Sequence, residues 1–151
     1  MNGLEYAGFW IRVGASLIDT LLMLIIILPL VSFIYGEAYW TSGQMLLGFW
    51  DALLNYILPA VVVILFWVYK AATPGKMALR LKIVDAQTGQ AASKGQLIGR
   101  YFGYFVAILP LFLGIIWVGI DRKKQGWHDK LSGTVVVKNT EKARVVFQTE
   151  A

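Results

Sequence analysis

The chain has 151 residues, of which 58% are hydrophobic and only 15% charged, and its mean hydropathy is +0.62. A soluble domain carries about 25% charged residues, so this composition indicates a membrane protein, and the length suits one domain. The net charge is +5, and the absence of cysteine excludes disulfides, thiol redox chemistry and thiolate metal sites.

The first predicted membrane helix follows a short polar and aromatic lead. The 23 residues 13–35 contain one charge, Asp19, and are enough to cross a hydrocarbon core of roughly 30 Å at ~1.5 Å per residue. This stretch is too long for a secretory signal and lacks a basic leader, so we expect a retained helix. Arg12 stands at its start and Asp19 lies two turns inside it. Ionisable groups at such depth cost at least ~2.5 kcal/mol, so both should face protein or water.

The second predicted span is residues 53–69, after a loop over 36–52 that contains no lysine or arginine. Its aromatic end is followed by Lys70, as is typical of a headgroup layer. In the connector over 70–100, apolar and basic residues alternate from Leu79 to Val84 and predict a short strand. Residues 134–137 predict a second strand, and we expect the two to pair because a lone strand leaves its hydrogen bonds unmade.

The third apolar stretch, residues 97–120, has Pro110 in its middle. As one crossing it would place the seven basic residues of 121–151 outside, against the positive-inside rule. As a re-entrant or interfacial helical pair it keeps all 14 basic residues on the cytoplasmic side, together with both predicted strands. We prefer the pair, and a third span remains the alternative.

These elements predict an all-α membrane protein with two full transmembrane helices, the third apolar segment and a small two-stranded β element at the cytoplasmic surface. Residues 1–138 form a single membrane domain, and residues 139–151 form a polar tail. The distribution of basic residues places the N-terminus and the connector in the cytoplasm, and we expect the bacterial inner (plasma) membrane.

Three motifs carry a resemblance to a known family. They are Arg12-Val-Gly-Ala-Ser-Leu-Ile-Asp19, then Thr73-Pro-Gly-Lys76 with Leu79-Arg-Leu-Lys-Ile-Val-Asp85, and Gln125-Gly-Trp-His-Asp-Lys-Leu-Ser-Gly-Thr-Val-Val137. In order and spacing they resemble the RDD family of small membrane proteins, named after one arginine and two aspartates.

Two residues, Arg12 and Asp19, match the first two letters of that name, and for the third we prefer Asp129 over Asp121. Trp127 stands where the family pattern suggests leucine. The resemblance implies an integral membrane module that is suspected of transport, with cation–proton antiport proposed for some members.

The partners of the two intramembrane charges are open at this point. Arg12 either snorkels to headgroups or forms a salt bridge, and Asp19 is either a proton or cation site or a packing hydrogen bond. The two lie about 10 Å apart along the helix, too far to pair. From its depth we predict that Arg12 binds a carboxylate after the third stretch, Asp129 first and Asp121 second.

The polar segment after the third stretch contains further candidates. His128 either titrates near neutral pH beside Asp129 or caps a turn. The basic residues Arg122, Lys123 and Lys124 are predicted to contact anionic lipids, worth about 1 kcal/mol per charge, in preference to nucleic acid. We expect no metal site, no cofactor and no enzyme activity, because no ligand cluster, phosphate loop or catalytic triad is visible.

Two classes of function remain. In the first, Asp19 binds a proton, cation or small solute for transport, which requires a homo-oligomer because so few spans cannot enclose a pathway. In the second, buried charges fix helix packing in a membrane scaffold whose basic cytoplasmic face recruits partners or anionic lipids. A cavity reaching Asp19 favours transport, and a dry, satisfied Asp19 favours packing.

Overall fold

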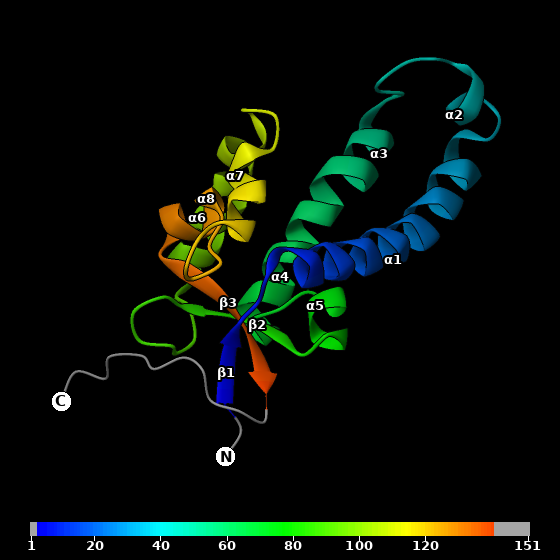
Figure 1. The fold of residues 1–151 in the computed structure, drawn as a ribbon. Helices are drawn as coiled ribbons and strands as arrows, with labels where there is room; N and C mark the ends of the chain where they lie inside the picture. Colours follow the sequence, from blue (N-terminus) through cyan, green and yellow to red (C-terminus); the bar gives the residue numbers. More distant parts are fainter. Residues whose placement is uncertain (1–2, 141–151) are drawn as a thin grey trace.

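Two long apolar helices project from one end of the molecule in the computed structural model, which describes residues 3–140 (Figure 1). The first is α1, Phe9–Tyr35, and the second runs over Phe49–Lys70; both are long and apolar enough to cross a membrane. The second consists of α3 (Phe49–Ala52), a π-helical turn (Leu53–Ile57) and α4 (Leu58–Lys70). The short helix α2, Ala38–Thr41, lies in the loop that joins them.

The third apolar stretch is a bent pair of helices. α6, Lys94–Ile108, begins at a capping box made by Ser93 and Gln96, and α7, Leu113–Ile116, continues into a 3-10 turn over Trp117–Gly119. The two parts are bent by 115° at the break around Pro110, which is the geometry of a broken span or of a re-entrant loop. Gly114 allows them to pack closely, because a Cβ there would lie 2.6 Å from the Cα of Ala107.

A three-stranded antiparallel sheet lies where all these helices converge. Its strands are β1 (Gly3–Tyr6), β2 (Leu81–Asp85) and β3 (Thr134–Thr140), in the order β1-β3-β2. The predicted pairing of the two later strands is confirmed, with Ile83 opposite Val136. β2 begins later than expected because Arg80 has a φ of 58° and ends the preceding turn.

The prediction of a two-stranded element is wrong, because β1 adds a third strand to the far side of β3. The four residues of β1 belong to the short polar and aromatic lead, for which no strand was predicted, although Leu4 and Tyr6 alternate with Glu5. β3 also continues through Asn139 and Thr140, and residues 141–151 of the expected polar tail lie outside the described residues.

The core joins the sheet to the helices. One face of the sheet packs on the helices through a buried cluster that includes Leu81, Ile83, Val136, Trp67 and Leu97. Its opposite face carries a smaller cluster of Val84, Val135 and Val137.

Large apolar side chains farther along α1 remain exposed, as in Ile25 (70%) and Phe33 (90%). Their exposure suits helices that meet lipid beyond the core.

Candidate functional site

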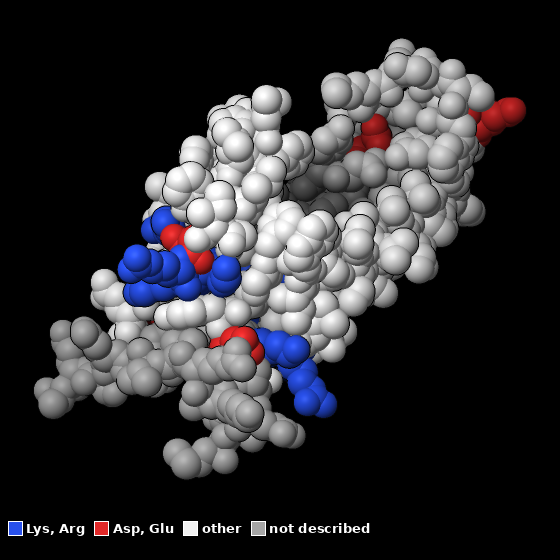
Figure 2. Space-filling model, viewed as in Figure 1, with Lys and Arg blue, Asp and Glu red and all other residues white. Residues whose placement is uncertain are grey.

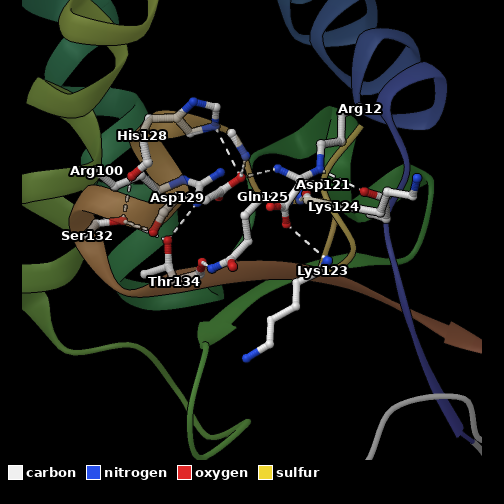
Figure 3. Close-up of polar contacts among 12 residues, drawn as sticks. Arg12, Arg100, Asp121, Lys123, Lys124, Gln125, His128, Asp129, Ser132 and Thr134 are labelled. Carbon is white, nitrogen blue, oxygen red and sulfur yellow. Dashed lines mark hydrogen bonds and ion pairs between the residues drawn. The ribbon is translucent and has the colours of Figure 1, made fainter. Parts of the chain in front are cut away.

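A fully buried carboxylate, Asp129, lies at the centre of the polar contacts drawn in Figure 3. It belongs to the short helix α8, Trp127–Ser132, which follows the extended Gly126. The Oδ2 of Asp129 accepts a hydrogen bond from the backbone N–H of Gly126 at 2.9 Å. This local contact orients the carboxylate, but it leaves the negative charge to be balanced by other elements.

Two arginines from different helices bind the two oxygens of Asp129. The Nη1 of Arg12 in α1 lies 2.6 Å from Oδ2, and the Nη1 of Arg100 in α6 donates to Oδ1. Arg12 is 9% exposed and also donates to the carbonyls of Ala7 (3.0 Å) and Lys124 (2.5 Å). The predicted Arg12–Asp129 pair is therefore confirmed, and Arg12 does not snorkel.

The second arginine is the main residue that the sequence analysis missed. Arg100 is 0% exposed and its Nη1 also donates to the Thr134 hydroxyl at 2.8 Å. The available signal was its position as the one charge in the third apolar stretch, four residues before Tyr104. Because Arg100 shares Asp129 with Arg12 and also binds Thr134, this network connects α1, α6, α8 and β3 (Figure 3).

The local electrostatics keep Asp129 ionised and its neighbour His128 neutral. Burial alone would raise the pKa of Asp129, but Arg100 and Arg12 outweigh it and hold that pKa well below its usual value. Burial lowers the pKa of His128 to about 3, and its ring stacks on Tyr104 with 3.9 Å between the centroids. Of the two alternatives for His128, titration near neutral pH does not fit this burial, and His128 lies inside α8 as its second residue rather than capping a turn.

Asp121, the second choice for Arg12, has another partner. It forms an ion pair with Lys130 at 2.5 Å and accepts backbone N–H groups from Lys123 (3.0 Å) and Gln125 (3.2 Å). It thereby organises the 121–126 loop. In this loop Arg122 and Lys123 are exposed and form no ion pair with the described residues, while Lys124 donates to the Gly119 carbonyl. Lipid contact by this basic cluster stays a prediction.

The second intramembrane charge, Asp19, is held by the connector. Its carboxylate accepts hydrogen bonds from the hydroxyl of Thr73 at 2.5 Å and from the backbone N–H of Gly75 at 2.7 Å. Gly75 lies in α5, Pro74–Ala78, and a Cβ there would lie only 2.1 Å from the carbonyl oxygen of Ala15. Glycine at this position therefore lets α5 approach the α1 backbone and reach Asp19.

The residue that follows Gly75 in that motif, Lys76, was also given no role by the sequence alone. Lys76 is 6% exposed and its Nζ lies 5.6 Å from the centroid of the Trp67 ring. Burial lowers its pKa, although Asp19 and Tyr104 partly offset this effect. Three basic residues, Arg12, Lys76 and Arg100, are thus buried in this part of the molecule.

A groove between the two long helices reaches Asp19 from the opposite side. Its cavity has a volume of about 390 Å³ and is lined by Asp19, by Asn55 and by apolar residues of α1 and α4. A second cavity of about 420 Å³, lined by Asp51, lies toward the 36–52 loop, and both cavities share Tyr39 and Asn55. Each cavity therefore has one carboxylate, and no lysine or arginine lines either within the described residues.

The surface, like the walls of the two cavities, has few basic residues toward the 36–52 loop. On the face drawn in Figure 2, lysine and arginine gather near the sheet, whereas the end that carries α2 and α3 shows only acidic charge. Between residues 3 and 140, no group of three or more His, Cys, Asp or Glu residues is placed to hold a metal ion. Each cavity thus offers one carboxylate and, within the described residues, no basic side chain.

Comparison with known proteins identifies related sequences. The RDD family model matches residues 6–133. The chain is 43% identical over 76 residues to an uncharacterized protein of Rickettsia prowazekii, covering 50% of this chain and 42% of that protein. It therefore spans less than half the length of that relative.

Among the relatives that match over most of the chain are two proteins of Bacillus subtilis. One is the uncharacterized protein YxaI, 33% identical over 147 residues that cover 87% of this chain and 96% of that protein. The other is the uncharacterized membrane protein YteJ, 28% identical over 141 residues that cover 87% of this chain and 80% of that protein. No solved structure matches the chain significantly.

Proposed function

The chain belongs to the RDD family, and from this premise we propose that it is an integral membrane module that transports a proton, a small cation or a small solute through the groove beside Asp19. Membrane integration is supported by the family, by the relative named as a membrane protein and by the two apolar helices. The transport function rests on the groove and its charge.

The observation that carries the proposal is that Asp19 lines one of two cavities that share Tyr39 and Asn55, and that no described lysine or arginine lines either cavity. A carboxylate offers about four acceptor positions, and Asp19 uses two of them for Thr73 and Gly75. The remaining positions are available to a proton or to a cation that has entered past Asp51 and Asn55. A cleft lined by one sign of charge between apolar walls concentrates ions of opposite sign.

Transport in this form requires a homo-oligomer. The groove is walled by α1, by the 49–70 helix and, at one end, by Tyr39 of α2, so no third long helix covers its side within the described residues. A second copy packed against this opening would close the pathway to lipid. The exposed apolar side chains of α1 provide area for such a contact.

The proposed orientation places the sheet, the N-terminus and the connector in the cytoplasm of a bacterial cell, with α6 and α7 as a re-entrant pair. It is supported by the basic residues near the sheet and by their absence from 36–52. The chain has no cysteine, so Lys94→Cys and Gln44→Cys variants allow clean labelling from either side. Labelling of both from outside would contradict the orientation.

The experiment is ion flux in proteoliposomes with wild type and Asp19→Asn. We expect the variant to abolish proton-coupled cation flux, while Asp85→Asn, the same change at a half-buried carboxylate that ends β2 and lines neither cavity, leaves it intact. Thermal unfolding of both variants must show that the fold is retained. Equal flux in wild type and Asp19→Asn would contradict the proposal.

A scaffold function is the second candidate, and the arginine–carboxylate network favours it specifically. Asp129 in α8 joins α1 to α6, and Arg100 extends this network to Thr134 of the sheet, so the buried charges fix helix packing and present a basic face to partners or lipids. Under this function, wild type shows no flux for any cation, and Asp129 variants lose association with partners without a change in flux.

A further inference from the structure

A separate cavity of about 350 Å³ lies at the sheet end of the molecule, away from the groove. Its basic wall consists of Lys70 at the end of α4, Arg80 before β2, and Lys82 within β2. Its apolar wall includes Leu4, Met77 and Val137. The volume falls in the range of small-molecule sites, roughly 300–1,000 Å³.

The three cations of this cavity have no countercharge of their own. Among the described residues no carboxylate lines the cavity, and Lys70, Arg80 and Lys82 form no ion pair. All three residues are exposed, so their charges lie at the surface and are not neutralised within the core. Several like charges around a hollow with apolar walls create a strong attraction for an anion.

The position of the cavity relates it to the bilayer. Lys70 is the last residue of the second candidate span, and its neighbour Tyr69 is 77% exposed. The chain then turns along the outer edge of β2, where the carbonyl of Ala71 accepts the N–H of Ile83 at 2.6 Å. The cavity therefore lies where a helix that crosses a membrane leaves it, at the depth of the headgroups.

We propose that this cavity binds the phosphate of an anionic phospholipid headgroup. Lys70, Arg80 and Lys82 surround the phosphate, and Met77 and Leu4 contact the glycerol and the upper acyl chain. Basic pockets beside membrane helices on the cytoplasmic side bind lipid headgroups in this way. The site is distinct from the exposed cluster Arg122–Lys124, which lines none of the cavities described above.

The test measures binding of short-chain phosphatidylglycerol to the purified full chain in neutral detergent. We expect phosphatidylglycerol to bind at least tenfold more tightly than phosphatidylcholine of the same chain length. Each lost cation should weaken this binding roughly fivefold, so Arg80→Gln/Lys82→Gln should lose about 25-fold. Inorganic phosphate at the same concentrations should not compete.

The matched control is Arg122→Gln/Lys123→Gln, which removes the same charge from exposed positions outside the cavity. It should change the affinity less than threefold. If the double cavity variant does not fold, Lys82→Gln alone should still lose about fivefold, because its side chain is exposed on an edge strand. Equal losses in cavity and control variants, equal binding of phosphatidylcholine, or competition by inorganic phosphate would each overturn the proposal.

Discussion

Replacing Asp129 by asparagine should be the most destabilising single change of charge in the described protein. The substitution keeps the shape of the side chain but leaves Arg12 and Arg100 buried without an anion. Removing one member of a buried ion pair costs about 3–5 kcal/mol. At about 2–4 °C per kcal/mol, the midpoint of thermal unfolding in detergent should fall by about 6–20 °C.

Comparing the stability loss of Asp129→Asn with that of Arg12→Gln tests whether one carboxylate binds both arginines. In that variant Asp129 still binds Arg100, so the loss should be only about 1.5–3 kcal/mol, the value of hydrogen bonds to charged groups. The double variant Arg12→Gln/Asp129→Asn should be no more stable than Asp129→Asn, because Arg100 remains unpaired. An isolated pair would instead give similar losses for both single variants and little further loss on combining them.

The assay is thermal unfolding followed by tryptophan fluorescence, with Asp121→Asn as the matched control. Asp121 pairs with Lys130, whose side chain is 44% exposed, and such pairs contribute at most about 1 kcal/mol. The control should therefore lose no more than about 4 °C. Equal losses for Asp129→Asn and Asp121→Asn would refute the reasoning.

Two further predictions concern pH and close packing. Because the folded pKa of His128 is lowered to about 3, its stabilising effect is complete above its unfolded pKa near 6.5 and is lost as the pH falls below that value. Stability should drop by about 2 kcal/mol from pH 7.5 to pH 5; the drop should be absent in His128→Phe, and its persistence there would contradict the assignment. Gly75→Ala should cost about 1–3 kcal/mol, because the new methyl group meets the Ala15 carbonyl, whereas Gly95→Ala should be neutral or slightly stabilising. Equal unfolding midpoints for the two alanine variants would show that α5 does not contact α1 as described.

Local patterns were sufficient to predict most elements of the fold. The lengths of the apolar runs predicted both long helices, and the isolated strand patterns predicted the pairing of β2 with β3. The depth argument also predicted that Arg12 binds Asp129, since both lie at the ends of apolar stretches.

The remaining contacts depend on tertiary docking. Asp19 is held by Thr73 and Gly75, 54 and 56 residues away, and only the approach of α5 to α1 brings them together. Arg100 stands near the start of an apolar stretch, and its burial depends on the packing of α8 against α6, which the local sequence does not reveal. β1 was too short for its alternation to stand out, because a four-residue strand gains stability only from its partner.

The accessibility of Asp19 through the groove is tested most directly by reaction with a hydrophobic carbodiimide, which modifies protonated carboxyl groups within membranes. Mass spectrometry of the purified protein in lipid should find Asp19 modified at low pH, with less modification as the concentration of a transported cation is raised. The account predicts that the modified peptide disappears in Asp19→Asn and that Met23→Trp, which fills the groove, slows the reaction. An unmodified Asp19 at every pH and cation concentration, beside a modified Glu37, an exposed carboxyl group of the 36–52 loop, in the same sample, would contradict it.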